Sequence, residues 1–110
     1  MNRQRILVTG ASGFVGGAVV ERLSKQPELY DVVAAGRSER GVDGSACRIV
    51  SGLELSEPAG WAEALQGVDV VIHCASTIFD INDKDFAWKT NYYITKDLIE
   101  ISAEYNVKKF

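Results

Sequence analysis

The chain has 110 residues, of which 46% are hydrophobic and 25% are charged, and its net charge is −3. This composition predicts one soluble globular domain with a hydrophobic core. The charge gives no reason to expect nucleic acid or an anionic membrane as a partner, and no segment approaches the roughly 20 apolar residues of a membrane span. The opening residues, MNRQRILVTG, leave no room for a secretory signal, so we expect a cytoplasmic protein.

Strand-like and helix-like patterns alternate along the chain. Short apolar runs predict buried strands over residues 5–9, 31–37, 48–50 and 68–76, with a fifth strand opening at 107–110. Apolar residues at helical spacing predict helices over residues 14–25 and about 85–105, with a short helix between Ser56 and Gly67. The residues of the long helix that we expect to face inward are Phe86, Ile94, Leu98 and Ile101.

Local signals mark the ends of the short helix. Ser56 is suited to cap it, Pro58 to occupy its first turn, and Gly67 to end it. The two cysteines, Cys47 and Cys74, lie near or in strands without a CxxC spacing, so we expect both to be reduced and structural.

Strict alternation of strands and helices predicts parallel pairing with right-handed crossovers and helices on both faces. The fold class is therefore α/β, a doubly wound parallel sheet formed by residues 1–110 as one domain. Because the sequence stops as the fifth strand opens, we expect the sheet to be incomplete in its C-terminal half.

Three glycines, at three-residue intervals, lie where the first strand passes into the first helix. In a turn that holds a dinucleotide, one glycine makes the turn, one admits the pyrophosphate, and one lets the helix pack closely. The ligand then lies on free N–H groups at the helix start. The candidate contacts are Gly10, Ser12, Gly13, Phe14, Val15 and Gly16. A tightly packed turn without a ligand is the alternative, and the hydroxyls of Thr9 and Ser12 could either reach phosphate or brace the turn.

Four segments resemble the extended branch of the short-chain dehydrogenases/reductases. TGASGFVGG (residues 9–17) resembles its TGxxGxxG motif, and LQGVDVVIHCAS (65–76) its fourth strand. KTNYYITKDLIE (89–100) resembles its asparagine-containing helix, and YNVKKF (105–110) the approach to its fifth strand. This branch includes nucleotide-sugar epimerases and dehydratases, 3β-hydroxysteroid dehydrogenases and dihydroflavonol-type reductases. The resemblance implies a Rossmann fold that binds a nicotinamide dinucleotide and, in the intact protein, a small-molecule substrate.

The end of the second strand favours NADP over NAD as the cofactor. An NAD site usually places an acid there, about 20 residues beyond the glycines, but this sequence has Gly36 and Arg37. The guanidinium of Arg37 suits a 2′-phosphate, and Ser38 and Arg40 could add a hydroxyl and a second charge. The alternative is that Arg37 is a solvated loop cation.

The resemblance implies further contacts. Glu54 and Leu55 match the Asp-Leu pair that lies beside the adenine in relatives, although Leu55 is equally suited to ordinary core packing. Residues at the end of the fourth strand line the cofactor groove in relatives, and they correspond here to Cys74, Ala75 and Ser76. We expect His73 to be a packed or loop-bonding histidine rather than a catalytic base.

The matching asparagine of the long helix is Asn91, which in relatives bonds backbone and supports the catalytic lysine through water. Solvent exposure is its alternative role. The family's catalytic groups are a Ser or Thr after the fifth strand and a Tyr-x-x-x-Lys pair on the next helix. Tyr92 and Lys96 have that spacing but lie one strand–helix unit too early, so we expect the pair to be coincidental.

The catalytic group is therefore expected to lie beyond Phe110, and we expect the chain alone to be inactive. The resemblance implies an enzyme whose intact form transfers hydride at a carbinol or ketone carbon. A non-catalytic cofactor-binding sensor or assembly module is the alternative. An exposed edge on the fourth strand suggests a truncated or misread chain, or pairing edge to edge in a homodimer.

Overall fold

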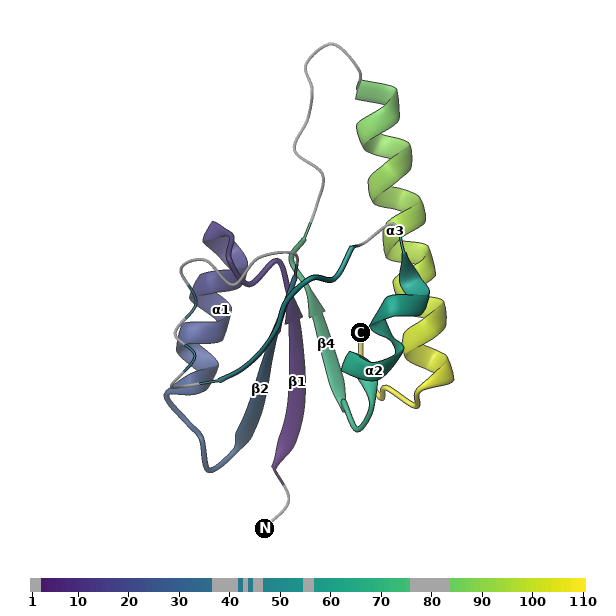
Figure 1. The fold of residues 1–110 in the computed structure, drawn as a ribbon. Coiled ribbons are helices and arrows are strands. Elements are labelled where there is room, and N and C mark those ends of the chain that lie inside the picture. The colour runs from purple at the N-terminus through teal and green to yellow at the C-terminus, as the bar shows by residue number, and fades with distance from the viewer. Residues whose placement is uncertain (1–2, 37–41, 43, 45–46, 55–56, 76–83) are drawn as a thin grey trace.

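The structure is a computed structural model that describes residues 3–36, 42, 44, 47–54, 57–75 and 84–110. Strands and helices alternate as the sequence predicts (Figure 1). The strands are β1 (Gln4–Thr9), β2 (Tyr30–Ala35), β3 (Arg48–Val50) and β4 (Val70–His73). The helices are α1 (Phe14–Ser24), the 3₁₀ helix η1 (Pro58–Trp61), α2 (Ala62–Leu65) and α3 (Lys84–Glu104).

The strands form one parallel sheet in the order β3-β2-β1-β4. From β1 the chain adds β2 and then β3 on one side of the sheet. It then crosses back and adds β4 on the other side of β1. This order confirms the predicted doubly wound α/β fold. The carboxyl ends of β1 and β4 come together where the strand order reverses, which is where such sheets bind ligands.

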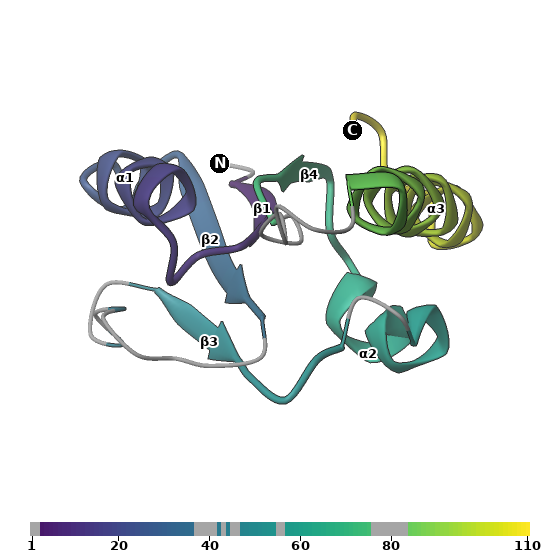
Figure 2. The ribbon, with the colours of Figure 1, turned by 90° about the horizontal axis from the view of Figure 1, so that it is seen from above.

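The two faces of the sheet bury separate apolar clusters. Figure 2 shows α1 on one side of the sheet and α2 and α3 on the other. On the α1 side, Val8, Val20 and Ala34 belong to one buried cluster. On the other side, Trp61 and Leu98 pack with alternate residues of the same strands, among them Leu7, Val33 and Val71. Each strand is thus covered on both faces, as its apolar run predicts.

Two predicted strands are shorter in the structure than in the sequence analysis. The predicted strand over residues 68–76 pairs only over Val70–His73. Before its start, the Asp69 amide still donates to the Arg5 carbonyl at 2.9 Å, but the Arg5 amide donates to the Asp69 carboxylate, also at 2.9 Å, and not to a backbone carbonyl. The second strand, predicted over residues 31–37, ends at Ala35, after which the Gly36 carbonyl accepts a hydrogen bond from the Leu53 amide at 3.0 Å.

The short helix begins differently from the prediction. Glu57, not Ser56, is the residue before η1, and among the described residues no side chain caps that helix. Ser56 itself lies outside the described residues. Pro58 does occupy the first turn, and Gly67 follows the end of α2 with a φ of 74°. A backbone that enters a 3₁₀ turn at a proline has already lost one amide that would need a cap.

The long helix agrees closely with the prediction. Leu98 is buried and Ile101 packs partly buried against the same cluster, while Ile94 is half-buried; the side chain of Phe86 lies outside the described residues. The first half of α3 extends past the carboxyl ends of the strands (Figure 1). Within the described residues, no helix has the length and apolar character needed to cross a membrane.

The outer edge of β4 is partly paired. A parallel bridge joins Val70 to Lys109, and the Val71 amide donates to the Lys109 carbonyl at 2.9 Å. Lys108 adds a bond from its amide to the Asp69 carbonyl at 2.8 Å. The segment after α3 therefore starts a fifth parallel position, as the sequence predicts, and it leaves only part of the β4 edge open to another strand.

Candidate functional site

The corner between β1 and α1 depends on the missing side chain of Gly10. Its φ is 68°, a conformation that side chains disfavour. A Cβ added there would lie 2.7 Å from the Ala75 amide nitrogen and 2.9 Å from its Cα. The end of β4 therefore passes directly against this corner, and a side chain at Gly10 would push the two apart.

Gly13 and Gly16 let the corner fold back on itself. The Gly13 amide donates to the Gly10 carbonyl at 2.9 Å. Gly16 is buried in the first turn of α1, where an added Cβ would lie 2.7 Å from the Gly10 carbonyl carbon. That neighbour is backbone and has no side-chain freedom with which to yield. An added Cβ would thus meet the end of β4 at Gly10 and the Gly10 carbonyl group at both Gly13 and Gly16.

The start of α1 leaves its backbone donors open. Phe14, Val15 and Gly16 begin the helix, and within the described part of the chain their amides have no acceptor. Gly13 supplies no capping side chain and the first turn carries no acid. Unpaired amides and the positive end of the helix dipole together attract an anion. Phe14 is 97% exposed, so its ring does not fill the corner, and Ser12 is exposed beside it.

Thr9 braces this corner from inside. It is fully buried, so its hydroxyl is not a phosphate ligand. The hydroxyl accepts hydrogen bonds from the amides of Cys74 and Ala75 at 3.0 and 3.1 Å and lies 2.7 Å from Nδ1 of His73. Sequence reasoning left the role of Thr9 open and missed this pairing. The signal was available, because Thr9 and His73 each end a strand and adjacent parallel strands place such residues side by side.

His73 is packed, as the sequence analysis expects. Besides its contact with Thr9, its ring lies 5.9 Å from the ring of Phe110 between centroids. Desolvation lowers the pKa of this imidazole. A histidine held in this way is neutral near pH 7 and is not placed as a base toward open solvent.

The residues at the end of β4 present backbone rather than side chains to the corner. The Cys74 side chain packs, partly buried, against the cluster on the α1 side, as does that of Cys47. Desolvation raises the pKa of the Cys74 thiol. Ala75 is half-buried and Ser76 lies outside the described residues. The packing of both cysteines agrees with a structural role.

The end of β2 offers no carboxylate in the described residues. Ala34, Ala35 and Gly36 close the strand, and the Gly36 amide donates to the Val50 carbonyl at 3.1 Å. The acid of this strand, Asp31, lies at the opposite end, where it bonds Nε of Arg5 at 2.9 Å. The predicted contacts Arg37, Ser38 and Leu55, together with Arg40, lie outside the described residues.

Glu54 is exposed and held through its backbone. Its carbonyl accepts a hydrogen bond of 3.0 Å from Nε1 of Trp61, which is fully buried under the sheet. The segment from Leu53 to Glu54 is therefore fixed at both ends, by Gly36 and by Trp61.

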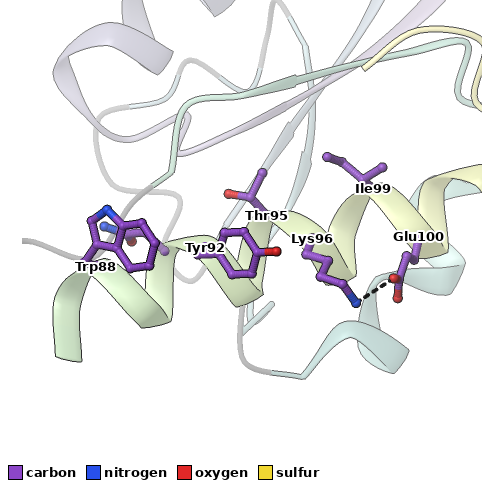
Figure 3. A pocket seen from close by; sticks show the side chains of 7 residues that line it. Trp88, Tyr92, Thr95, Lys96, Ile99 and Glu100 are labelled. Atoms are coloured by element: carbon purple, nitrogen blue, oxygen red, sulfur yellow. Dashed lines mark hydrogen bonds and ion pairs between the residues drawn. The ribbon is translucent and has the colours of Figure 1, made fainter. Parts of the chain in front are cut away.

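The groove on the outer side of α3 contains the Tyr92–Lys96 pair (Figure 3). The Lys96 ammonium bonds Glu100 at 2.8 Å, and this interaction raises the pKa of Lys96. Tyr92 instead stacks on Trp88, with ring centroids 5.9 Å apart. The Lys96 ammonium thus bonds an acid one turn further along the helix, and a coincidental Tyr92–Lys96 spacing stays a prediction. Asn91 is half-buried and also lines this groove, which has a volume of about 650 Å³.

Comparison with known proteins identifies the family. A model described as "NAD dependent epimerase/dehydratase family" matches residues 6–110. The chain belongs to the NAD-dependent epimerase/dehydratase family. This result confirms the resemblance read from the four sequence segments, and it makes the chain a member of a family that binds a dinucleotide cofactor.

Named proteins and solved structures show how far the similarity extends. The human protein named sterol-4-alpha-carboxylate 3-dehydrogenase, decarboxylating, is 34% identical over 96% of this chain and 27% of its own length. A UDP-glucose 4-epimerase structure from Thermotoga maritima aligns with a TM-score of 0.79 and 25% identity, over 97% of this chain and 36% of its own. A short-chain dehydrogenase/reductase superfamily structure from Agrobacterium tumefaciens with bound NAD aligns with a TM-score of 0.71 and 27% identity. The alignment covers 94% of this chain and 30% of that structure's chain.

The chain spans 27–29% of the length of the three mammalian sterol dehydrogenases that it matches. The shared part is the alternating sheet that contains the glycine corner. The family membership therefore rests on residues 6–110, and the activity of a whole protein is a matter for proposal.

Proposed function

We propose that this chain is the NAD(P)-binding part of an oxidoreductase or nucleotide-sugar epimerase/dehydratase that transfers hydride at a carbinol or ketone carbon. The observation that carries the proposal is the β1–α1 corner. There, Gly10 and Gly16 leave no space for side chains, and the first amides of α1 have no acceptor within the described residues. Such a corner accepts a pyrophosphate at the switch point of the sheet.

The proposed contacts fall into groups along the cofactor. The pyrophosphate is bound by the corner residues Gly10, Ser12, Gly13, Phe14, Val15 and Gly16. At the other end of the dinucleotide, Glu54 and Leu55 lie beside the adenine. Near the nicotinamide, Cys74, Ala75 and Ser76 form the wall of the groove, and Asn91 positions neighbouring groups from α3. The bound nicotinamide supplies the hydride chemistry, and these residues bind and orient it.

We further propose NADP as the preferred cofactor, with Arg37 and Ser38 on its 2′-phosphate. Two features of the described residues support this. The end of β2 carries no acid that would bond a free 2′-hydroxyl, and Asp31 is held by Arg5 at the far end of the strand. A guanidinium at the next position matches a phosphate in charge and geometry.

The proposed substrate is a small molecule with a secondary alcohol or ketone. The 34% identity to a protein named as a sterol dehydrogenase favours a sterol-like carbinol as the substrate. The fold similarity to a UDP-glucose 4-epimerase makes nucleotide sugars the second class of substrate to test. No feature of the described residues favours the alternative of a non-catalytic cofactor-binding module.

Calorimetric titration of the chain with NADPH and with NADH tests the proposal directly. We expect saturable binding of both, with NADPH bound more tightly. A matched experiment uses Gly16→Ala, which disturbs the corner, and Gly60→Ala, whose added Cβ meets no atom within 4 Å. Loss of binding in Gly16→Ala alone supports the corner as the site. Undetectable binding of both nucleotides to the unmodified, folded chain would overturn the proposal.

A further inference from the structure

The hydroxyl of Thr9 joins three groups at the carboxyl end of β4. It lies 3.0 Å from the Cys74 amide, 3.1 Å from the Ala75 amide and 2.7 Å from Nδ1 of His73. Thr9 itself is fully buried, whereas its three partners are half-buried. Thr9 and His73 are register partners on neighbouring parallel strands, and this pairing places their side chains on the same face of the sheet.

The bonding capacity of a hydroxyl fixes the state of the histidine. A threonine hydroxyl has one proton to donate and two lone pairs that accept. Two backbone N–H groups, which can only donate, use both lone pairs. The single hydroxyl proton must therefore go to Nδ1 of His73, which accepts it. The imidazole is then neutral and carries its proton on Nε2.

A proton on Nδ1 does not fit this arrangement. The imidazolium would direct an N–H at an oxygen whose lone pairs are already used, so one of the two backbone bonds would have to break. The Cys74 amide has a second acceptor, the Thr9 carbonyl at 3.3 Å. The Ala75 amide has only the hydroxyl within the described residues. Ala75 is therefore the group that protonation releases.

We propose that Thr9 and His73 form a proton-sensitive latch that holds Ala75 against the glycine corner and thereby sets the affinity of the corner for the cofactor. The Ala75 nitrogen lies 2.7 Å from where a Cβ of Gly10 would be. A shift of Ala75 therefore changes the contact that defines the corner. His73 is a positioning residue in this scheme, acting through Thr9, and the effect on the cofactor depends on the function proposed above.

The described neighbours of His73 come from β1, from its own strand and from the segment after α3. On β1 its partner is the hydroxyl of Thr9, and after α3 its neighbour is the ring of Phe110. Cys74 packs toward the opposite face and its pKa is raised. Tyr105, which follows α3, packs partly buried against the cluster on the His73 face.

Nuclear magnetic resonance on the free protein tests the latch without any cofactor. His73 is the only histidine of the sequence, so a chain prepared without a histidine tag gives a single imidazole signal. At pH 8 we expect the ¹⁵N shifts of a neutral ring with Nδ1 unprotonated. As the pH falls from 8 to 5, the Ala75 amide should shift with the same midpoint as the ring. A proton on Nδ1 at pH 8 would overturn the latch. So would an Ala75 amide whose chemical shift does not change as the ring titrates.

Two variants separate the latch from general packing. In His73→Asn the amide oxygen replaces Nδ1 as an acceptor but does not titrate, so the Ala75 shift with pH should vanish while the fold remains. Thr9→Ser keeps the hydroxyl and should keep the pH response. Thr9→Val removes it and should release Ala75 at every pH. Persistence of the response in a folded Thr9→Val or His73→Asn protein would contradict the proposal.

Binding of NAD⁺ measured by calorimetry at pH 8 and pH 5 connects the latch to function. NAD⁺ is the suitable probe because it lacks the 2′-phosphate, whose own titration near pH 6 would interfere. In the unmodified chain we expect about threefold to tenfold weaker binding at pH 5, the effect of one backbone hydrogen bond, and no such loss in His73→Asn. Equal losses in both proteins would overturn the latch and leave the proposed function standing. Absence of binding of both NAD⁺ and NADPH at pH 8 would instead overturn the proposed function and with it the link to affinity.

Discussion

The β1–α1 corner and the end of β2 are proposed to hold two parts of one cofactor, but they do so by opposite means. At the corner, Gly10 and Gly16 are required because backbone atoms occupy the space that a side chain would need. At the end of β2, Gly36 has open space around its Cα, and the proposed selectivity depends on the side chain of the next residue. In the proposed function, binding of the common pyrophosphate therefore depends on the backbone, whereas the choice between NAD and NADP depends on a replaceable side chain.

The largest expected effect is that of Gly16→Ala at the corner. Its φ is not positive, so the only penalty is the close approach to the Gly10 carbonyl group, which is backbone. We expect about 1–3 kcal/mol lower stability in urea unfolding. NADH and NADPH affinity should both fall about 100-fold or more, because several charge-assisted bonds from the helix amides lose alignment together. Equal loss for the two nucleotides is what distinguishes the corner from the end of β2.

Its control is Gly60→Ala in η1, where no atom lies within 4 Å of the added Cβ. Stability should stay within about 0.5 kcal/mol and both affinities should be unchanged. If Gly16→Ala folds and binds like this control, the steric account of the corner is wrong.

The next effect in size is that of Arg37→Ala. Removing one charge-assisted contact with a phosphate should weaken NADPH by about 10- to 100-fold and leave NADH within about twofold. Fluorescence titration of the bound nicotinamide measures both. Arg22→Ala, an exposed arginine in the last turn of α1, is the charge-matched control and should change neither. Parallel losses of NADPH and NADH would mean that Arg37 supports the fold and does not select the cofactor.

A smaller effect on affinity is expected from Trp61→Phe. The change removes the 3.0 Å bond to the Glu54 carbonyl and part of a fully buried ring. We expect about 1–3 kcal/mol lower stability but less than about threefold change in the affinity for either nucleotide. Trp88→Phe on α3, where the side chain is 66% exposed, is the control and should stay within about 0.5 kcal/mol. A large loss of affinity in Trp61→Phe would show that the Glu54 backbone is as important as the corner.

The sequence was sufficient for the fold because each element carried its own signal. The apolar runs identified the four strands, and the spacing of Leu98 and Ile101 identified the buried face of α3. The glycine corner was predictable for the same reason, since its requirement is local and shows as missing side chains. Strand ends were less certain because they depend on partners far along the chain, such as the Asp69 carboxylate that bonds the Arg5 amide.

The pairing of Thr9 with His73 was not predicted because it joins residues 64 positions apart. A hydroxyl before a glycine motif is consistent with either phosphate binding or bracing, and only burial distinguishes the two. The cap of the short helix was misplaced for a related reason. Ser56 is a good capping residue, but Pro58 at the start of a 3₁₀ turn moved the boundary to Glu57. Residues whose role depends on a partner in space need the structure.

The smallest expected effect is the dependence of stability on pH. It should differ between a change beside the β1–α1 corner and a change after β2. Burial lowers the pKa of His73 below 6.5 in the folded chain, so below that pH the unfolded chain binds more protons. The contribution to stability is therefore complete above pH 6.5 and is lost as the pH falls toward the folded pKa. Urea unfolding at pH 8, 7, 6 and 5 should show this loss in the unmodified chain and in Arg37→Ala, but not in His73→Asn. The other groups that titrate in this range are the same in all three proteins. If their free energies of unfolding change with pH in parallel, protonation of His73 does not destabilise the fold.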